Sequence, residues 1–144
     1  MKKHYSQHIV LRVIVRLLIP YIFMFGLYIQ LHGEYSPGGG FQAGVICAAV
    51  FIVFSLLYGL EHAKELLSVA TLRILSGLGV LIYGGVGVAA MLFHGQFLNY
   101  SMLAADRVEG QKLGILVIEL GVGLTVFAVM LLIYYVFSQK VLER

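Results

Sequence analysis

Residues 113–137 read LGILVIELGVGLTVFAVMLLIYYVF, and this stretch contains a single charged side chain, Glu119. A helix needs about 20 apolar residues to cross the hydrocarbon core of a bilayer. The strands of a membrane barrel would instead alternate apolar and polar residues, which this stretch does not do. It therefore predicts a transmembrane helix.

Three similar apolar blocks precede it, at residues 9–31, 41–60 and 72–93. Of the 144 residues, 60% are hydrophobic and 12% are charged, whereas a typical soluble domain is about a quarter charged. This composition excludes a soluble globular enzyme, a disordered chain and, because the basic residues are scattered, a nucleic-acid-binding protein. We expect an all-α integral membrane protein in which residues 1–144 form one domain with four transmembrane helices.

The distribution of Lys and Arg predicts the topology. An even number of spans puts both termini on one side, together with Lys2, Lys3, Arg12, Arg16, Lys64, Arg73, Lys140 and Arg144. The other side holds only Arg107 and Lys112. Since cytoplasmic segments carry the excess of Lys and Arg, we expect both termini in the cytoplasm. The first block is too long for a cleaved signal peptide, so we interpret it as a retained helix.

Glu119 is the first candidate for a functional residue, because it lies about two turns inside the fourth block. A charge within hydrocarbon costs at least ~2.5 kcal/mol, so this side chain must face protein or water, or carry a proton. It could relay protons or sodium ions, or form an ion pair with a partner subunit. It could equally be a neutral side chain that bonds to a neighbouring helix. No second acidic residue lies deep in an apolar block, so this protein alone lacks a chain of several relay residues.

Arg12 and Arg16 lie one turn apart on one face of the first helix, at its expected cytoplasmic end. Two interpretations remain open, namely contact with lipid headgroups and an ion pair with an acidic residue of a neighbouring subunit. Pro20 removes the hydrogen bond that the Arg16 carbonyl would otherwise accept, which favours a kink there.

The most distinctive motif follows the first block and reads PGGGFQAG at residues 37–44. Its consecutive glycines permit backbone conformations that other residues avoid. It is not a phosphate-binding loop, because no Gly-Lys-Ser/Thr follows. The spacing of Gly40, Gly44 and Ala48 predicts a smooth helix face for close packing. We interpret the motif as a packing and interface device, with Gln42 placed to bond across the contact; direct contact with an ion is the alternative.

Small residues recur in the later blocks, where Gly85 and Ala89 form a second pair with this spacing. Small residues on several faces favour a subunit of a larger assembly. The outer segment 95–112 mixes apolar and charged residues, and it could lie along the membrane interface or dock on a partner. The charged segment 61–65 is interpreted as a solvated cytoplasmic turn.

The sequence predicts no metal site, no cofactor and no catalytic residue. The five His residues fall at helix ends or in the N-terminal tail, without HxxxH or HExxH spacing. Cys47 is the single cysteine and lies inside an apolar run. Nothing in the chain points to a flavin, an iron–sulfur cluster or a nickel centre.

At the Pro37-Gly-Gly-Gly-Phe-Gln-Ala-Gly44 motif the sequence resembles the MnhB-domain family, the B subunits of multi-subunit Mrp/Mnh sodium–proton antiporters. Glu119, with Gly121, Leu124 and Thr125, resembles the acidic stretch of that family, so the resemblance covers nearly the whole chain. Ala43 departs from it, because many members carry Gly there. The resemblance implies that Pro37, Gly38, Gly39, Gly40, Phe41, Gln42 and Gly44 form a motif important to the subunit.

The resemblance also implies a non-catalytic, multi-pass subunit of a hetero-oligomeric complex in a prokaryotic cytoplasmic membrane. In such a complex large subunits move sodium ions and protons, while the B subunit supports assembly and lines part of an ion path. Similar domains occur in membrane-bound hydrogenases and related redox-driven pumps. A membrane-arm subunit of such a complex is therefore the second interpretation. A purely structural scaffold without ion contact is the third interpretation.

Overall fold

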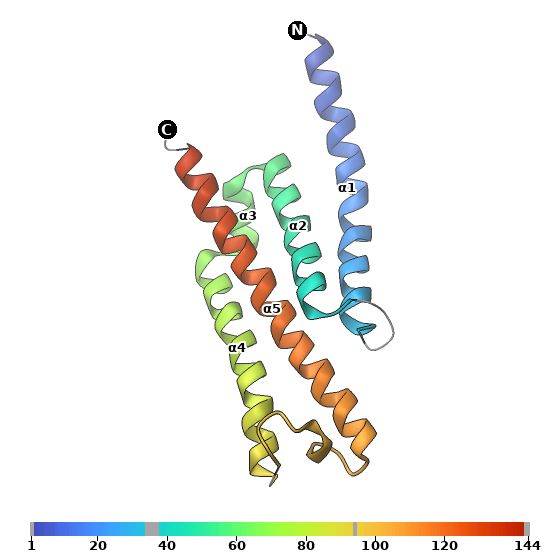
Figure 1. Cartoon of the computed structure of the whole chain (residues 1–144). Helices are drawn as coiled ribbons and strands as arrows, with labels where there is room; N and C mark the ends of the chain where they lie inside the picture. Colours follow the sequence, from blue (N-terminus) through green and yellow to red (C-terminus); the bar gives the residue numbers. More distant parts are fainter. Residues whose placement is uncertain (1, 34–37, 94, 143–144) are drawn as a thin grey trace.

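The computed structural model describes residues 2–33, 38–93 and 95–142, with the backbone alone at residues 2–8 and 142. Figure 1 shows the long helices α1 (Lys2–Leu31), α2 (Gly40–Tyr58), α4 (Val69–Leu92) and α5 (Arg107–Leu142), with the short helix α3 (Leu60–Leu66). A 3-10 turn, η1, covers Tyr100–Met102. Four helices of the described chain are long and apolar enough to cross a membrane, and no strand occurs in it. The predicted all-α fold with four candidate spans is confirmed.

The helices differ from the predicted blocks at their ends. Helix α5 begins at Arg107 rather than residue 113, because Asp106 caps it by accepting a hydrogen bond from the Val108 amide at 3.3 Å. Helix α2 ends at Tyr58 rather than residue 60, because Gly59 adopts a φ of 98° and breaks the helix.

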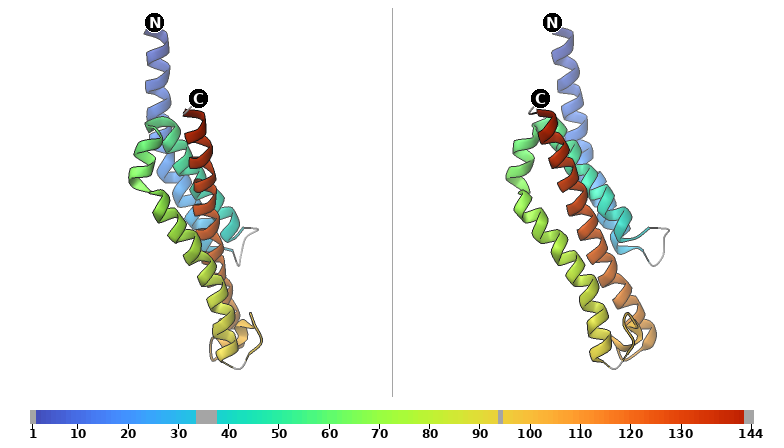
Figure 2. Two further views of the ribbon diagram at one scale, coloured as in Figure 1. Left: turned by 90° about the vertical axis from the view of Figure 1, so that its left-hand side faces the viewer. Right: turned by 60° about the vertical axis from the view of Figure 1, so that its left-hand side comes forward.

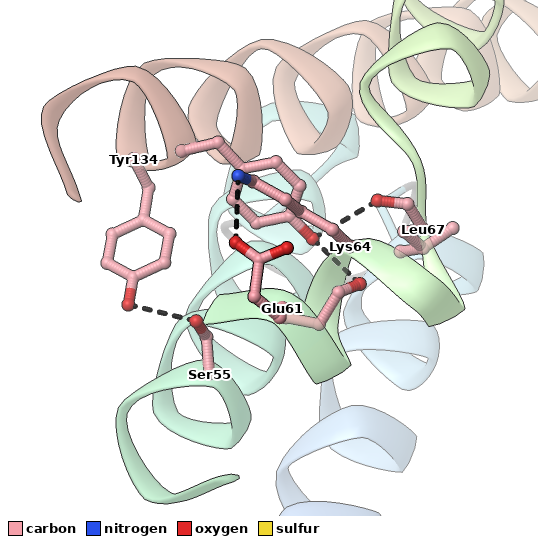
Figure 3. Close-up of polar contacts among 7 residues, drawn as sticks. Ser55, Glu61, Lys64, Leu67 and Tyr134 are labelled. Atoms are coloured by element: carbon pink, nitrogen blue, oxygen red, sulfur yellow. Dashed lines mark hydrogen bonds and ion pairs between the residues drawn. The ribbon is translucent and has the colours of Figure 1, made fainter. Parts of the chain in front are cut away.

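The segment predicted as a solvated turn is instead the helix α3, and one face of it is buried. Leu60 and Ala63 pack into the core, while Glu61 stays exposed and pairs with Lys64 at 3.2 Å. Figure 3 shows this pair beside α5. The charge pattern indicated the solvated face correctly but gave no sign of the buried one.

The core lies where α2, α3, α4 and α5 meet. Its buried residues are Ala48, Leu60, Ala63, Leu72, Ala128, Leu131 and Tyr135. Tyr134 of α5 also donates a hydrogen bond to Ser55 of α2 at 3.1 Å (Figure 3).

Helix α5 is the central element, because both α2 and α4 pack along it, while α1 packs mainly on α2. Figure 1 shows both ends of the chain at the same end of the molecule, as an even number of spans requires. The N-terminal part of α1 diverges from the other helices there.

The two helical hairpins are shifted along their axes. Gly40, the first residue of α2, meets α5 at Glu119, which lies twelve residues after the start of α5. Twelve helical residues rise about 18 Å. Helices α4 and α5 therefore continue well past the α1–α2 connection, as both views of Figure 2 show.

Candidate functional site

The Glu119 carboxyl group lies against the α1–α2 connection, where glycines leave space for it. A Cβ added at Gly39 would lie 2.8 Å from its Oε1, and one added at Gly33 would lie 2.8 Å from the carboxyl carbon. Real Cβ atoms do not approach other atoms so closely. Gly33 and Gly39 thus border a half-buried carboxyl group, and Gly40 meets the Glu119 backbone; we call these three residues the glycine cradle.

The first turns of α2 touch the backbone of α5. A Cβ at Gly40 would lie 2.8 Å from the carbonyl carbon of Glu119, and one at Gly44 would lie 2.6 Å from the carbonyl oxygen of Gly123. Ala48 continues the same face and is fully buried. The structure therefore places the small-residue face of α2 on α5, the close contact that the spacing predicts.

The other residues of the PGGGFQAG motif do not all lie in the contact between α2 and α5. Gln42 does not bond across the helix contact, because its Oε1 accepts a hydrogen bond from the Gly39 amide at 3.2 Å and so caps α2. Phe41 is exposed, and Gly38 is half-buried. Pro37 lies outside the described residues.

Gln30 is a polar residue that the sequence analysis missed. Only 8% of it is exposed, and a Cβ at Gly123 would lie 3.3 Å from its amide carbon. Its Nε2 is buried and has no hydrogen-bond partner in the described part of the chain. Its polar side chain near the end of the apolar block 9–31 is a signal in the sequence. The sequence alone, however, does not show that this face of α1 is covered by α5.

The opposite side of α5 packs on α4 through a different glycine pair. A Cβ at Gly79 would lie 2.5 Å from the Gly121 carbonyl oxygen, and Thr125 donates to that same carbonyl at 2.9 Å. Gly85, which forms the second small-residue pair with Ala89, meets no helix of the described chain, since nothing there lies within 4 Å of a Cβ added at Gly85. The role of this pair in a larger assembly stays a prediction. Six residues separate Gly79 from Gly85, which puts Gly85 on another face of the helix.

The outer segment folds back on the chain's own helices. A Cβ at Gly114 would lie 2.5 Å from the Cβ of Tyr100, and one at Gly87 would lie 2.5 Å from the Cζ of Phe97. Burial raises the pKa of the Tyr100 phenol, and the charge of the nearby Tyr83 raises it further. The segment thus has an intramolecular docking site on α4 and α5.

Arg12 and Arg16 are exposed in the N-terminal half of α1. The structure shows no acidic side chain of the described chain paired with either of them. No group of three or more His, Cys, Asp or Glu side chains within the described residues could hold a metal ion.

Four helices that are long and apolar enough to cross a bilayer indicate a multi-pass membrane protein. Residues 10–132 match the model of the MnhB family, which is described as a domain related to the MnhB subunit of Na+/H+ antiporter. The chain therefore belongs to this family. It is 31% identical over 131 residues to the proteins named antiporter subunit mnhB2 in Staphylococcus aureus strains Newman and COL. Those matches cover 84% of this chain and 92% of each relative. The family comprises transporter subunits rather than enzymes.

Proposed function

We propose that this chain is a subunit of a multi-subunit sodium–proton antiporter, that it supports assembly of the complex, and that Glu119 lies on the ion path. Membership of the MnhB family supports the first part. The observation that supports the ion-path role is the position of the Glu119 carboxyl group against Gly33 and Gly39 of the glycine cradle.

A carboxyl group inside a bilayer is costly unless protein or water surrounds it, and such residues commonly mark ion and proton pathways. Glycines at 33, 39 and 40 remove the side chains that would otherwise occupy the space around Glu119. Protons and sodium ions are proposed as the cations on this path because the family is related to a subunit of a Na+/H+ antiporter.

The complex belongs, in this proposal, to a prokaryotic cytoplasmic membrane, with both termini of the chain inside. The excess of Lys and Arg on the side of the termini supports this orientation. A reporter that is active only outside the cytoplasm should be inactive when fused after residue 144 and active when fused within residues 95–106. The reverse pattern would contradict the orientation.

The exposed end of α1 is where a neighbouring subunit or lipid headgroups would meet Arg12 and Arg16. A redox-driven pump related to membrane-bound hydrogenases is the alternative host. Copurification in mild detergent distinguishes the hosts, because companion chains with nickel or iron–sulfur centres would identify the alternative and overturn the antiporter proposal.

The ion-path role is tested by Glu119→Gln in the assembled complex, with sodium-driven proton movement measured in inside-out vesicles. We expect at least a tenfold loss of antiport, while Glu119→Asp, which keeps a carboxyl group, retains part of it. Glu109→Gln, an exposed change on the same helix, is the matched control and should retain activity. An assembled Glu119→Gln complex with normal antiport would leave only the assembly role.

A further inference from the structure

The end of α1 lies against one turn of α5, and each side of this contact carries one polar side chain and one glycine. Gln30 and Gly33 come from the α1 side, and Glu119 and Gly123 come from α5; we call these four residues the α1–α5 seam. A Cβ added at Gly33 would lie 2.8 Å from the Glu119 carboxyl carbon, and one added at Gly123 would lie 3.3 Å from the Gln30 amide carbon. Each polar side chain thus packs on the glycine of the opposite side.

The Gln30 amide holds a donor without an acceptor. Gln30 is more than nine-tenths buried, and its Nε2 has no hydrogen-bond partner in the described part of the chain. A buried donor that lacks an acceptor destabilises the conformation that holds it. Because Nε2 is buried where it lies, no group from outside reaches it there. The donor gains a partner only when the amide itself turns toward an acceptor.

Glu119 offers the strongest acceptor in the α1–α5 seam. A hydrogen bond to a carboxylate is roughly twice as strong as one between neutral groups. The carbonyl groups of the surrounding helical turns already accept hydrogen bonds within their own helices. An ionised carboxylate has room for about four hydrogen bonds, so it accepts a further donor beside other contacts.

The Glu119 carboxyl group is within reach of the Gln30 side chain. The His32 amide donates to the Ile29 carbonyl at 3.3 Å, so the helical course continues past the end of α1. Side chains three residues apart on such a course have Cβ atoms about 5–6 Å apart. The Gln30 Cβ therefore lies within about 9 Å of the Glu119 carboxyl carbon. The glutamine side chain covers part of this distance, and one water with a hydrogen bond of about 2.8 Å on each side spans about 5.6 Å.

We propose that Gln30 is a positioning residue for Glu119: when the carboxyl group releases its proton, the Gln30 side chain turns toward it, and Nε2 donates a hydrogen bond to the carboxylate, directly or through one water. When the proton returns, the carboxyl group loses its charge and the amide returns to its place against Gly123. Taken with the ion-path role of Glu119, on which this step rests, Gln30 sets the pH at which Glu119 releases its proton.

Other titratable groups near Glu119 are separate from this contact. Among the described residues, α1 is followed by His32, whose Nδ1 donates to the Tyr28 carbonyl at 3.1 Å. On α5 the nearest is Lys112, an exposed side chain seven residues, or about 10 Å, before Glu119. The first turn of α2, residues 40–44, holds no titratable side chain. A change at Gln30 leaves all of these groups in place.

The test uses the assembled complex and measures the protonation of Glu119 directly. Infrared spectra across a pH series follow the C=O stretch of the protonated carboxyl group, assigned as the band that Glu119→Gln lacks. Gln30→Met removes the donor and keeps the length of the side chain. We expect the midpoint of the Glu119 band to move up by about one pH unit, a tenfold higher proton affinity, because a hydrogen bond to the charged form favours that form.

Gln111→Met is the matched control. Gln111 is an exposed amide on α5 that donates to Ser101 at 2.9 Å, outside the α1–α5 seam. This change should leave the midpoint of the Glu119 band as in the wild type. The pH profile of sodium-driven antiport should move with the midpoint in Gln30→Met. A residue that only fills space would change the amount of assembled complex and leave the pH profile in place.

An assembled Gln30→Met complex with the wild-type midpoint would overturn the proposal. If Gln30→Met does not assemble, the wild-type complex decides. With an isotope label in the side-chain amide of glutamine, its difference spectrum between low and high pH should contain an amide band that Glu119→Gln lacks, and the absence of that band would also overturn the proposal. Normal antiport in Glu119→Gln would instead remove the ion-path role and leave the midpoint shift intact, so the two conclusions fail separately.

Discussion

At the scale of single residues, the glycines of this chain are not equivalent. The Cα of Glu119 lies 3.0 Å from where a Cβ at Gly40 would stand, whereas nothing lies within 4 Å of a Cβ at Gly85. We expect Gly40→Ala to force α2 away from α5 and to destabilise the protein by about 1–3 kcal/mol, the usual cost of overpacking. Thermal unfolding of the purified protein in detergent measures the change.

Gly85→Ala is the matched control, since it makes the same chemical change in the interior of another helix. It should leave stability unchanged or raise it by roughly 0.5–1 kcal/mol, because alanine loses less conformational entropy than glycine. Equal effects of the two substitutions would show that the α2–α5 contact is looser than described.

Part of the candidate site could be predicted from the sequence. A lone acidic residue in an apolar block identified Glu119, and glycine spacing identified the contact face of α2. That the two features meet could not be predicted, because the axial register between α2 and α5 depends on tertiary packing. Gln30 was missed for the same reason, since its burial is produced by Gly123 of a helix distant in sequence.

At the scale of elements, the four long helices were predictable because each needs about 20 apolar residues. Helix α3 was not, because seven residues of mixed charge carry too weak a pattern, and an isolated helix of that length is unstable in water. Its stability comes from tertiary contacts. The Tyr135 hydroxyl of α5 donates to the carbonyls of Ala63 at 3.0 Å and Leu67 at 3.2 Å.

Tyr135→Phe should therefore loosen α3 while the long helices remain folded. Each lost hydrogen bond is worth about 0.5–1.5 kcal/mol. Hydrogen–deuterium exchange should accelerate at residues 60–68. Tyr134→Phe, the neighbouring change, removes a bond to Ser55 of α2 and should leave exchange in α3 as in the wild type. Unaltered exchange in Tyr135→Phe would show that apolar burial alone holds α3.

At the scale of the whole molecule, the shift between the two hairpins has a consequence for depth in the membrane. The α1–α2 connection meets α5 at Glu119, and the first residue of α5, Arg107, lies about 18 Å further along the axis. The exposed side chains on that extension are still apolar, with Leu92 76% and Phe93 61% exposed. We therefore expect the glycine cradle to lie deeper in the bilayer than the outer segment 95–112.

Spin labels at two exposed positions test this arrangement in the full chain, after Cys47→Ala removes the native thiol. A label at Phe41, next to the glycine cradle, should lie deeper in the bilayer than one at Phe97 in the outer segment. The depth difference should be about 10 Å rather than 18 Å, because Phe97 packs on Gly87, five residues or about 7.5 Å before the end of α4. Equal depths would mean that the hairpins are level in the membrane, and Glu119 would then lie at the membrane surface. In that case water would reach its carboxyl group directly, and a protected path through the glycine cradle would have no function.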